Sequence, residues 1–487
     1  MLPVNTTAVQ PKPVPAWLVL LFPLGAVIVS ITFATKPLIL IGLLIAIPVA
    51  LAVLRKPDLL IPVVTFLIFI NAPVVAVQYH RVPFVIAAAI PMLLVLPVAH
   101  QVFIKRQPII LTGATPPLFL FMLVQLLGVP HALRSDDAAE VVFASLTEGM
   151  VLYLLVLNVI RSSSMLRQVI WALLLAGTFL GALGLFQQVT RTYNKNYGGF
   201  AQVSNAAFEV AGSRTGQLQP RLAGPIGEKN FYAQYMLMLI PLGLSRWWAE
   251  ERTELRVLAL ACCFLIGIGA ALTFSRGAMV GFGVLVMMMM LAGYIRVRHL
   301  IPLAIGTLLI CLTVPALQTR FQKLLDAGSG DISTQSRLTE MMAAAMVFVD
   351  HPIVGVGPGM FRYHYEDYAD IFGLRLLAGD RASHNLYLGM AAENGLLGIL
   401  CFLAFLGITL YRLRRGWVTA RSPAAAHTCA AFFFSLIAFM ATSMFLNFAY
   451  VRYFWLLAAI AGAAPTVMAA EIRSPSDPID STSMESR

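Results

Sequence analysis

The sequence predicts an all-α fold, a polytopic membrane helix bundle of about 12–14 transmembrane helices. Of its 487 residues, 59% are hydrophobic and 12% are charged, whereas soluble domains carry about 25% charged residues. Stretches such as 38–54 are apolar at every position, unlike the alternating strands of a membrane β-barrel. The composition excludes a soluble enzyme with a single anchor, a disordered chain and a coiled coil.

Fourteen apolar stretches of roughly 15–22 residues are long enough to cross a bilayer as helices. With the N-terminus on the cytoplasmic side, fifteen Lys and Arg residues fall in short inner loops and five in short outer loops. This bias follows the positive-inside rule, so both termini are expected to be cytoplasmic, and most of the net charge of +11 is an orientation signal. The predicted helices lie near residues 17–33, 38–54, 59–78, 84–103, 116–130, 141–160, 167–189, 230–248, 255–273, 277–294, 299–317, 387–411, 426–446 and 451–469.

This topology places two long loops on the outer face. Long connections in compact domains are usually functional, and the sequence shows no separate soluble domain, so we expect the chemistry at these loops and at the helix ends beside them. The segments are a cytoplasmic tail (1–16), N-terminal transmembrane helices (17–189), a first outer loop (190–229), further transmembrane helices (230–317), a large outer loop (318–386), C-terminal transmembrane helices (387–469) and a disordered cytoplasmic tail (470–487).

The large outer loop is predicted to be partly helical. Residues 337–349 are rich in strong helix formers, and Asp350-His351-Pro352 supplies a stop because proline disfavours helix in the residue before it. A glycine turn follows at Gly355-Val-Gly357-Pro-Gly359, and residues 361–370 then interleave aromatic and hydrogen-bonding side chains. Such side chains can stack on sugar faces and grip hydroxyls, or can only pack the loop onto the bundle, and the sequence leaves both interpretations open.

Arg276 is the first candidate for anion binding. It follows Ser275 at the outer junction of two apolar helices, and no Asp or Glu lies within ten residues on either side. A guanidinium there is costly unless it is paired or meets an anion. The helix that begins at 277 directs free N–H groups and a positive dipole end to the same place. These features predict an anion site; the alternative is an arginine that reaches the outer headgroups.

Arg221 and Lys229 precede the next helix that starts on the outer face. They lie in Gln219-Pro-Arg-Leu-Ala-Gly-Pro-Ile-Gly-Glu-Lys-Asn230, where two glycines and two prolines in eight residues predict an irregular turn. The two cations and the start of the helix at 230 together are suited to binding an anion. Taken alone, either charge would more often be solvated. Two cationic turns on the same face predict a diphosphate clamp.

His384 lies at the outer entry to the helix predicted over 387–411. Imidazole can accept a proton from a hydroxyl near neutral pH. On a helix, Tyr387 shares a face with position 384, whereas Glu393 lies over two turns deeper. With Asn385, these residues complete the predicted substrate site. The alternative is an ordinary interfacial histidine that caps the helix.

We expect no metal ion or cofactor. His351, His364 and the nearby acids lack the spacing of metal ligands. The five cysteines all lie in apolar runs without a Cys-x-x-Cys pair. Gly355-x-Gly357-x-Gly359 lacks the strand and helix context of a dinucleotide-binding fingerprint.

Four motifs, in this order, resemble the O-antigen ligase/polymerase superfamily of bacterial membrane glycosyltransferases. The resemblance covers roughly residues 140–450. Each motif is loose alone, but the four together around one large outer loop are fairly specific. They are Arg221-Leu-Ala-Gly-Pro-Ile-Gly-Glu-Lys-Asn230, Phe274-Ser-Arg-Gly-Ala278, Asp350-His-Pro-Ile-Val-Gly-Val-Gly-Pro-Gly-Met-Phe361, and Ser383-His-Asn-Leu-Tyr387 with Glu393-Asn-Gly-Leu-Leu-Gly398.

The resemblance implies a glycosyltransferase C-like fold in the bacterial inner membrane, with the two outer loops in the periplasm. It also implies an inverting, metal-independent transfer of a glycan from undecaprenyl diphosphate to an acceptor hydroxyl. In that reaction the arginines matching Arg221 and Arg276 would hold the diphosphate, and the histidine matching His384 would serve the acceptor. The expected partners are this donor, a glycan or lipid-linked acceptor and the lipid bilayer, but no nucleic acid.

The sequence leaves the acceptor open. Fourteen helices and a mid-sized outer loop favour a polymerase of O-antigen or exopolysaccharide repeats over a ligase that joins O-antigen to lipid A-core in lipopolysaccharide biosynthesis. Two departures bear on this choice. Glu228-Lys229 stand where the family suggests a more neutral pair, and fourteen helices exceed the number typical of the ligases. A multi-pass anion transporter is the alternative from another class, although such carriers usually place polar or broken helices at the midplane.

Overall fold

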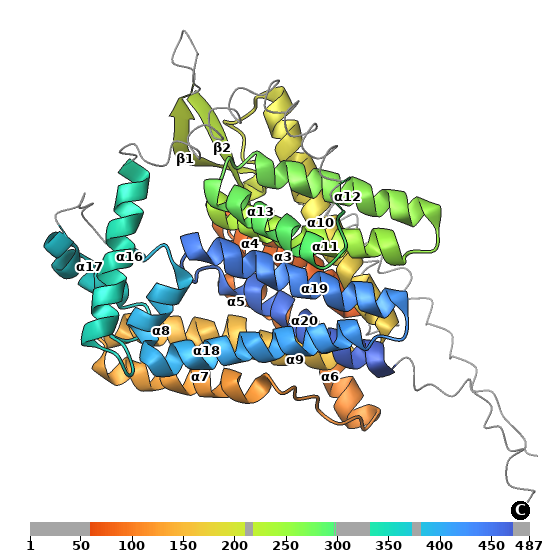
Figure 1. Cartoon of the computed structure of the whole chain (residues 1–487), viewed down its shortest axis with the longest axis horizontal. Helices are drawn as coiled ribbons and strands as arrows, with labels where there is room; N and C mark the ends of the chain where they lie inside the picture. Colours follow the sequence, from red (N-terminus) through yellow and green to blue (C-terminus); the bar gives the residue numbers. More distant parts are fainter. Residues whose placement is uncertain (1–58, 210–217, 297, 299–331, 373–380, 471–487) are drawn as a thin grey trace, which may run out of the picture. The chain divides into compact units, whose positions relative to one another are not determined.

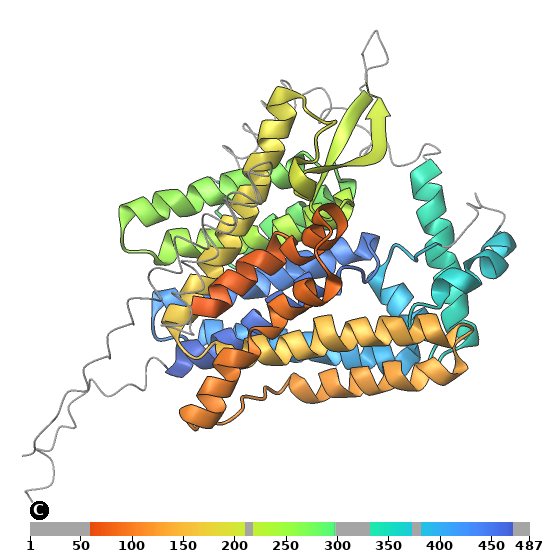
Figure 2. The same cartoon turned by 180° about the vertical axis from the view of Figure 1, so that it is seen from behind.

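The computed structural model describes residues 59–209, 218–296, 298, 332–372 and 381–470 as an α-helical bundle with one two-stranded hairpin (Figures 1 and 2). Before the hairpin come α3 (Leu60–Phe69), α4 (Ala72–His80), α5 (Phe84–Met92), α6 (Val95–Ala99), η2 (His100–Ile104), α7 (Thr115–Gly128), η3 (Val129–His131), α8 (Ser135–Ala144), η4 (Ser145–Val151), α9 (Leu152–Val159), α10 (Ser163–Thr190) and η5 (Tyr197–Gly199). The hairpin is β1 (Gln202–Glu209) and β2 (Leu218–Gly224). After it come α11 (Lys229–Ala249), α12 (Thr253–Ala271), α13 (Arg276–Leu291), α16 (Ile332–Asp350), α17 (Phe361–Ala369), η6 (Asp370–Phe372), α18 (Leu386–Val418), α19 (Pro423–Thr442), η7 (Ser443–Phe445) and α20 (Val451–Ala470).

Each predicted helix that falls within the described residues is present. The helices predicted at 17–33, 38–54 and 299–317 lie outside them. By length and composition, seven helices of the described part can cross a membrane, or eight if α3 and α4, bent by 54°, form one span. The prediction of an all-α, polytopic membrane bundle is confirmed. The seven are Phe84–Ile104, Ser135–Val159, Ser163–Thr190, Thr253–Ala271, Leu386–Val418, Pro423–Phe445 and Val451–Ala470.

The central helix of the bundle is α11, which is buried along most of its length. It packs against α12 and α19 (Figure 1). Polar side chains join α11 to α19: Gln234 Nε2 donates to Thr442 Oγ1 at 2.9 Å, and Ser435 Oγ donates to the Met238 carbonyl at 2.7 Å. Because α11 faces other helices, it can carry polar residues, and it is not among the seven apolar spans.

A β-hairpin lies within residues 190–229, where the sequence analysis expects no strand. β1 and β2 pair antiparallel with Ser204 opposite Arg221, and irregularities interrupt the register. The Leu222 N–H also donates to the Leu272 carbonyl at 3.2 Å, just before α13. The predicted irregular turn is therefore wrong for residues 218–224, because the partners of this strand lie elsewhere in the chain and no local pattern reveals them. A turn does form at 225–227.

The junction of α3 and α4 holds the turn that follows β2. Asn71 has a left-handed φ of 61° where the two helices bend, a conformation that asparagine tolerates. Its Nδ2 donates to the Pro225 carbonyl at 2.9 Å, and Gln202 Nε2 donates to the same carbonyl at 3.2 Å. The turn leading into α11 is thus fixed by residues from two distant parts of the chain.

Residues 332–372 contain two helices, of which α16 packs beside the start of α18 (Figures 1 and 2). α16 covers the helix predicted over 337–349 and ends at Asp350, as predicted. α17 is not predicted by the sequence, because six of its nine residues are Phe, Tyr, His or Asp, which have low helix propensity. The predicted glycine turn is confirmed: Gly355, Gly357 and Gly359 have φ of 72°, 103° and 73°.

The chain after α16 docks on a break in α18. At the break Gly395 has φ 63° and ψ −168°, a combination essentially confined to glycine. The N–H groups of Leu396 and Leu397, freed by the break, donate to the carbonyls of Pro352 at 2.7 Å and Ile353 at 3.2 Å. The motifs 350–361 and 393–398 are therefore two halves of one backbone joint. This joint sets the position of α16 against α18.

Candidate functional site

Arg221 braces the turn that begins α13. From β2, its Nε donates to the Thr273 carbonyl at 2.8 Å and its Nη2 to the Phe274 carbonyl at 3.1 Å. The Arg221 side chain is buried, with 8% of the residue exposed. Phe274 has a φ of 51°, and the two charge-assisted hydrogen bonds satisfy carbonyls that this sharp turn leaves without helical partners. Arg221 thus fixes the backbone from which Ser275 and Arg276 project.

Ser275 caps α13, as the predicted helix start requires. Its Oγ accepts from the Ala278 N–H at 3.4 Å and donates to Asn230 Oδ1 at 2.8 Å. Arg276 is the first residue of the helix and is half-buried. A narrow pocket reaches this helix end between α11, α13, α16 and η7. It is lined by Asn230, Ser275, Gly277, Ala278, Arg337, Thr442, Phe445 and Leu446.

The start of α11 does not offer the open anion site that the sequence predicts. The Glu228 carboxylate accepts from the N–H groups of Asn230 at 2.7 Å and Phe231 at 3.0 Å, so it occupies the helix N-terminus. At this position, where the family suggests a more neutral residue, Glu228 serves as the cap of α11. Lys229 Nζ lies 3.2 Å from Glu228 Oε1, so this cation is paired rather than solvated.

Three cations act on one another near this helix start. Burial lowers the pKa of the Lys229 ammonium from its ordinary value; Glu228 opposes the shift, and the charges of Arg221 and Arg337 add to it. Arg337, from α16, was not a sequence candidate, because its distance to the α13 turn depends on how the large loop folds back. Residues of β2, α11 and α16 thus bring positive charge to the same end of the bundle.

His384 is held by a buried carboxylate that the sequence analysis misses. Its Nδ1 lies 2.6 Å from Oε2 of Glu340 and 3.1 Å from the Ala382 carbonyl. The side chain is 31% exposed, and the backbone has a φ of 44°. Both neighbours of Nδ1 are acceptors, which favours the tautomer with its proton on Nδ1. Within the described part of the chain, no hydrogen bond engages Nε2.

Glu340 is fully buried on α16, with 0% of its side chain exposed. Arg381 donates to its Oε1 from Nε at 2.9 Å, and Arg381 Nη2 lies 2.7 Å from the same oxygen. A buried carboxylate requires such partners. The sequence does carry one signal: Glu340 is the sole acid within the apolar stretch 337–349, and an acid in such a helix needs a partner when it is buried. The pattern does not say which partner.

Asn385 and Tyr387 hold the start of α18 against the neighbouring helix. Asn385 Oδ1 accepts from the Leu388 N–H at 3.0 Å, and its Nδ2 donates to the Met444 carbonyl at 3.1 Å. The Tyr387 hydroxyl donates to the Met440 carbonyl at 2.9 Å. The helix cap of α18 is thus Asn385 and not His384, which leaves the imidazole available for its contact with Glu340.

Glu393 belongs to the backbone joint rather than to the surroundings of His384. Its carbonyl accepts from the Gly357 N–H at 3.0 Å, and the N–H groups of Gly359 and Phe361 face its carboxylate. Glu393 therefore contacts the glycine turn, and the structure does not bring it to the imidazole.

The aromatic residues of α17 divide between packing and a polar face. Phe361 and Tyr365 are buried against α16. Tyr363 is half-buried; its hydroxyl donates to Asp137 Oδ2, and the Arg134 guanidinium lies 4.7 Å from its ring centroid. Phe361 and Tyr365 therefore pack this segment onto the bundle, which is one of the two interpretations that the sequence leaves open.

These features define a class of protein: a multi-pass α-helical membrane protein with arginines and a carboxylate-bound histidine at one end of its bundle. Among the described residues, no three His, Cys, Asp or Glu side chains form a group that could hold a metal ion. Residues 261–403 match the family model for O-antigen ligase. This match supports the resemblance of the motifs to the O-antigen ligase/polymerase superfamily of glycosyltransferase-like enzymes. No curated protein matches the chain.

The matched segment runs from α12 into α18. It includes Arg276, Arg337, Glu340 and His384, whereas Arg221 lies outside it. The family match therefore covers the helix start at α13 and the histidine with its carboxylate. The bracing of the α13 turn by β2 is a contribution from outside the matched segment.

Proposed function

We propose that this protein transfers a glycan from undecaprenyl diphosphate to an acceptor hydroxyl at the periplasmic face of the inner membrane. The reaction is inverting and metal-independent, and the product is a polymer of O-antigen or exopolysaccharide repeats. The observation that carries the proposal is the placement of α16. Arg337 lines the pocket at the start of α13, and Glu340, three residues later, contacts His384. Along α16, a rise of about 4.5 Å therefore separates Arg337, which we assign to the glycan donor, from Glu340 and its partner His384, which we assign to the acceptor.

On the donor side, the leaving diphosphate gains negative charge as its bond to the sugar breaks. Arg337 lines the pocket at the start of α13, and Arg276 is the first residue of that helix. We expect their guanidiniums, with the N–H groups of the helix start, to stabilise this charge. Arg221 acts on this charge through the backbone, because its guanidinium holds the carbonyls of Thr273 and Phe274. A bidentate arginine clamp suits phosphate oxygens, and Lys229 adds positive charge nearby.

On the acceptor side, His384 is the general base. Glu340 and the Ala382 carbonyl keep the proton on Nδ1, so the lone pair of Nε2 can accept the hydroxyl proton. The hydroxyl oxygen forms its bond to the anomeric carbon on the side opposite the diphosphate, and the bond from that carbon to the phosphate oxygen breaks. The proton remains on the imidazole and the electron pair leaves with the diphosphate, so the anomeric configuration inverts.

An apolar groove supports a polyprenyl donor. It has a volume of about 490 Å³ and is bounded by α4, α5 and η4. Its polar end holds Arg452 and Glu148, whose Nη1 and Oε1 atoms lie 3.5 Å apart. Phe84 and Phe143 line it with largely exposed rings. We propose that this groove receives the isoprenoid chain.

Two experiments test the proposed function. The purified protein is incubated with a synthetic polyprenyl-diphosphate repeat unit, and extended product must form in the presence of EDTA; strict dependence on a divalent ion would overturn the metal-free reaction. The gene is also deleted in the source organism. Loss of long chains with single repeats retained indicates a polymerase, whereas polymer stranded on the polyprenyl carrier indicates a ligase to lipid A-core.

A further inference from the structure

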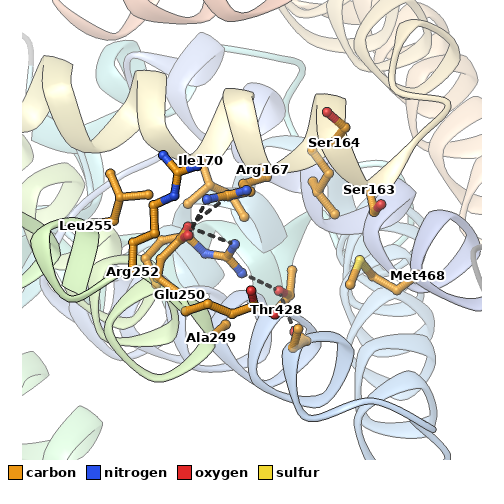
Figure 3. Close-up of a pocket in the computed structure, with 14 residues that line it drawn as sticks. Ser163, Ser164, Arg167, Ile170, Ala249, Glu250, Arg252, Leu255, Thr428 and Met468 are labelled. Atoms are coloured by element: carbon orange, nitrogen blue, oxygen red, sulfur yellow. Dashed lines mark hydrogen bonds and ion pairs between the residues drawn. The ribbon is translucent and has the colours of Figure 1, made fainter.

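A second polar cavity lies at the other end of α11, far from the α13 turn. It has a volume of about 650 Å³ and is lined by residues of α10, α11, α12, α19 and α20 (Figure 3). The candidate site lies at Asn230 and this cavity at Arg246 and Ala249. Because α11 has 21 residues, its two ends are about 30 Å apart, close to the apolar thickness of a bilayer. The two sites therefore belong to opposite membrane faces.

A buried carboxylate organises the cavity wall. Glu250 has 3% of its side chain exposed; Arg167 donates to it through Nε at 2.9 Å and through Nη2, and Trp171 Nε1 donates at 3.1 Å. Arg246 Nη1 lies 3.6 Å from the same carboxylate, and Figure 3 shows Glu250 beside Arg167. The single negative charge of Glu250 holds two arginines in place. It cannot neutralise both.

Positive charge and unused hydrogen-bond donors remain at this wall. Arg246 Nε is buried and, among the described residues, has no hydrogen-bond partner. Arg252 lines the cavity with an exposed side chain that forms no ion pair or hydrogen bond within the described part of the chain. The hydroxyl of Ser164 lies along the same wall. An oxyanion would use these donors, since arginine forks and hydroxyls match phosphate oxygens.

The surroundings place the cavity at the level of lipid headgroups. Trp247 and Trp248 precede Ala249 at the end of α11, and tryptophan is enriched at membrane interfaces. On α12, beyond the lining residue Leu255, the side chains of Val257 and Leu258 are exposed and apolar, as expected of a surface that faces acyl chains. A basic pocket between membrane helices at the interface is a typical site for an anionic lipid headgroup.

We propose that this cavity binds the phosphate headgroup of an anionic membrane phospholipid, with the acyl chains along α12. The site is separate from the proposed glycan transfer. Arg167 and Arg246 form its fixed wall, and Arg252 closes over the headgroup from the start of α12. A free phosphate ion shares the recognition chemistry and is the alternative that the test must separate.

The test measures the melting temperature of the full-length protein in phosphatidylcholine micelles as phosphatidylglycerol is added. The variants are Arg252→Gln and, as a matched control, Arg256→Gln, an exposed arginine one turn further along α12 that does not line the cavity. Removing one cation near the headgroups costs about 1 kcal/mol. We therefore expect Arg252→Gln to raise the half-saturating fraction of phosphatidylglycerol about fivefold, with little change in Arg256→Gln.

Three results would overturn the proposal. The first is a wild-type protein that phosphatidylglycerol does not stabilise, and the second is an equal response in both variants, which would indicate general surface attraction. The third is that inorganic phosphate raises the melting temperature of the wild type as much as phosphatidylglycerol does. The cavity would then bind a free anion rather than a lipid headgroup. Neither variant alters a hydrogen bond to Glu250. Because Arg256→Gln loses the hydrogen bond from Nε to the Trp247 carbonyl, each variant's response to lipid is measured relative to its own melting temperature without phosphatidylglycerol.

Discussion

Replacing Glu340 by glutamine changes the proposed base without emptying its site. Glutamine has nearly the same volume and can still accept from Arg381 through its amide oxygen. The amide nitrogen then faces Nδ1 of His384, which lies 2.6 Å from Glu340 Oε2 in the native protein. Two donors cannot face each other at that distance, so the imidazole is driven to the tautomer with its proton on Nε2. The lone pair that would accept the hydroxyl proton is lost.

The size of the effect follows from this change of tautomer. General-base catalysis contributes about 10²- to 10⁴-fold to a rate, equal to about 3–5 kcal/mol of barrier at 25 °C. Donor binding should change little, because Glu340 contacts Arg381 and His384 rather than the α13 turn. We expect Glu340→Gln to lower the single-turnover rate by at least about 100-fold, with donor affinity within a few-fold of wild type. The Glu340→Asp variant retains the charge and should lose less.

The assay is single-turnover transfer by purified protein, with donor affinity measured separately on the same samples. Asp367→Asn is the matched control, since Asp367 is an exposed acid of the same loop and lies on α17. An unchanged melting temperature shows that the Glu340→Gln variant is folded. If this folded variant keeps the wild-type transfer rate, or loses rate only through weaker donor binding, the reasoning about His384 is refuted.

Three further predictions follow from the joint, the bracing arginine and the chemistry. The Gly395→Ala variant should melt several degrees below the wild type or fail to fold, because the φ and ψ of this residue suit only glycine and a Cβ would overlap the Ile353 carbonyl. The control variant Gly407→Ala, in the same helix, should fold normally because a Cβ there meets nothing within 4 Å. Equal melting temperatures of the two variants would contradict the role of Gly395 in the joint. The Arg221→Met variant should have a lower melting temperature and a lower donor affinity, because two buried carbonyls lose their hydrogen-bond donors. Thermal melts and donor titrations should place the Arg221→Lys variant between Arg221→Met and the wild type. Wild-type donor affinity in the methionine variant would contradict the bracing role of Arg221. Transfer in EDTA should match transfer in Mg²⁺, and product formed only with the ion would refute this.

The bundle and the helix-start arginine could be predicted because their signals are local. Apolar length identifies the spans, and Ser275-Arg276-Gly277 shows a helix cap beside a cation. The four motifs together resemble one family, and the family model matches residues 261–403. These patterns need no knowledge of which distant segments meet.

The rest depends on contacts between segments far apart in the sequence. The charge of Arg221 predicts a diphosphate ligand, but β2 directs its guanidinium to the carbonyls of Thr273 and Phe274. Glu228 departs from the family pattern in the sequence, and only the start of α11 shows that its carboxylate caps the helix. Glu340 lies 44 positions before His384 (384 − 340), and only the joint at Gly395 brings α16 against α18. Tertiary contacts of this kind leave no local pattern.

The transfer reaction of the His384→Ala variant tests most directly whether His384 is the base. Purified wild-type and variant proteins are mixed with a polyprenyl-diphosphate glycan and an acceptor, and single-turnover product and donor binding are measured together. We predict that the variant binds the donor as the wild type does and transfers at least about 100-fold more slowly. Transfer by the variant at the wild-type rate, with the donor bound equally, would contradict the central claim that His384 is the base.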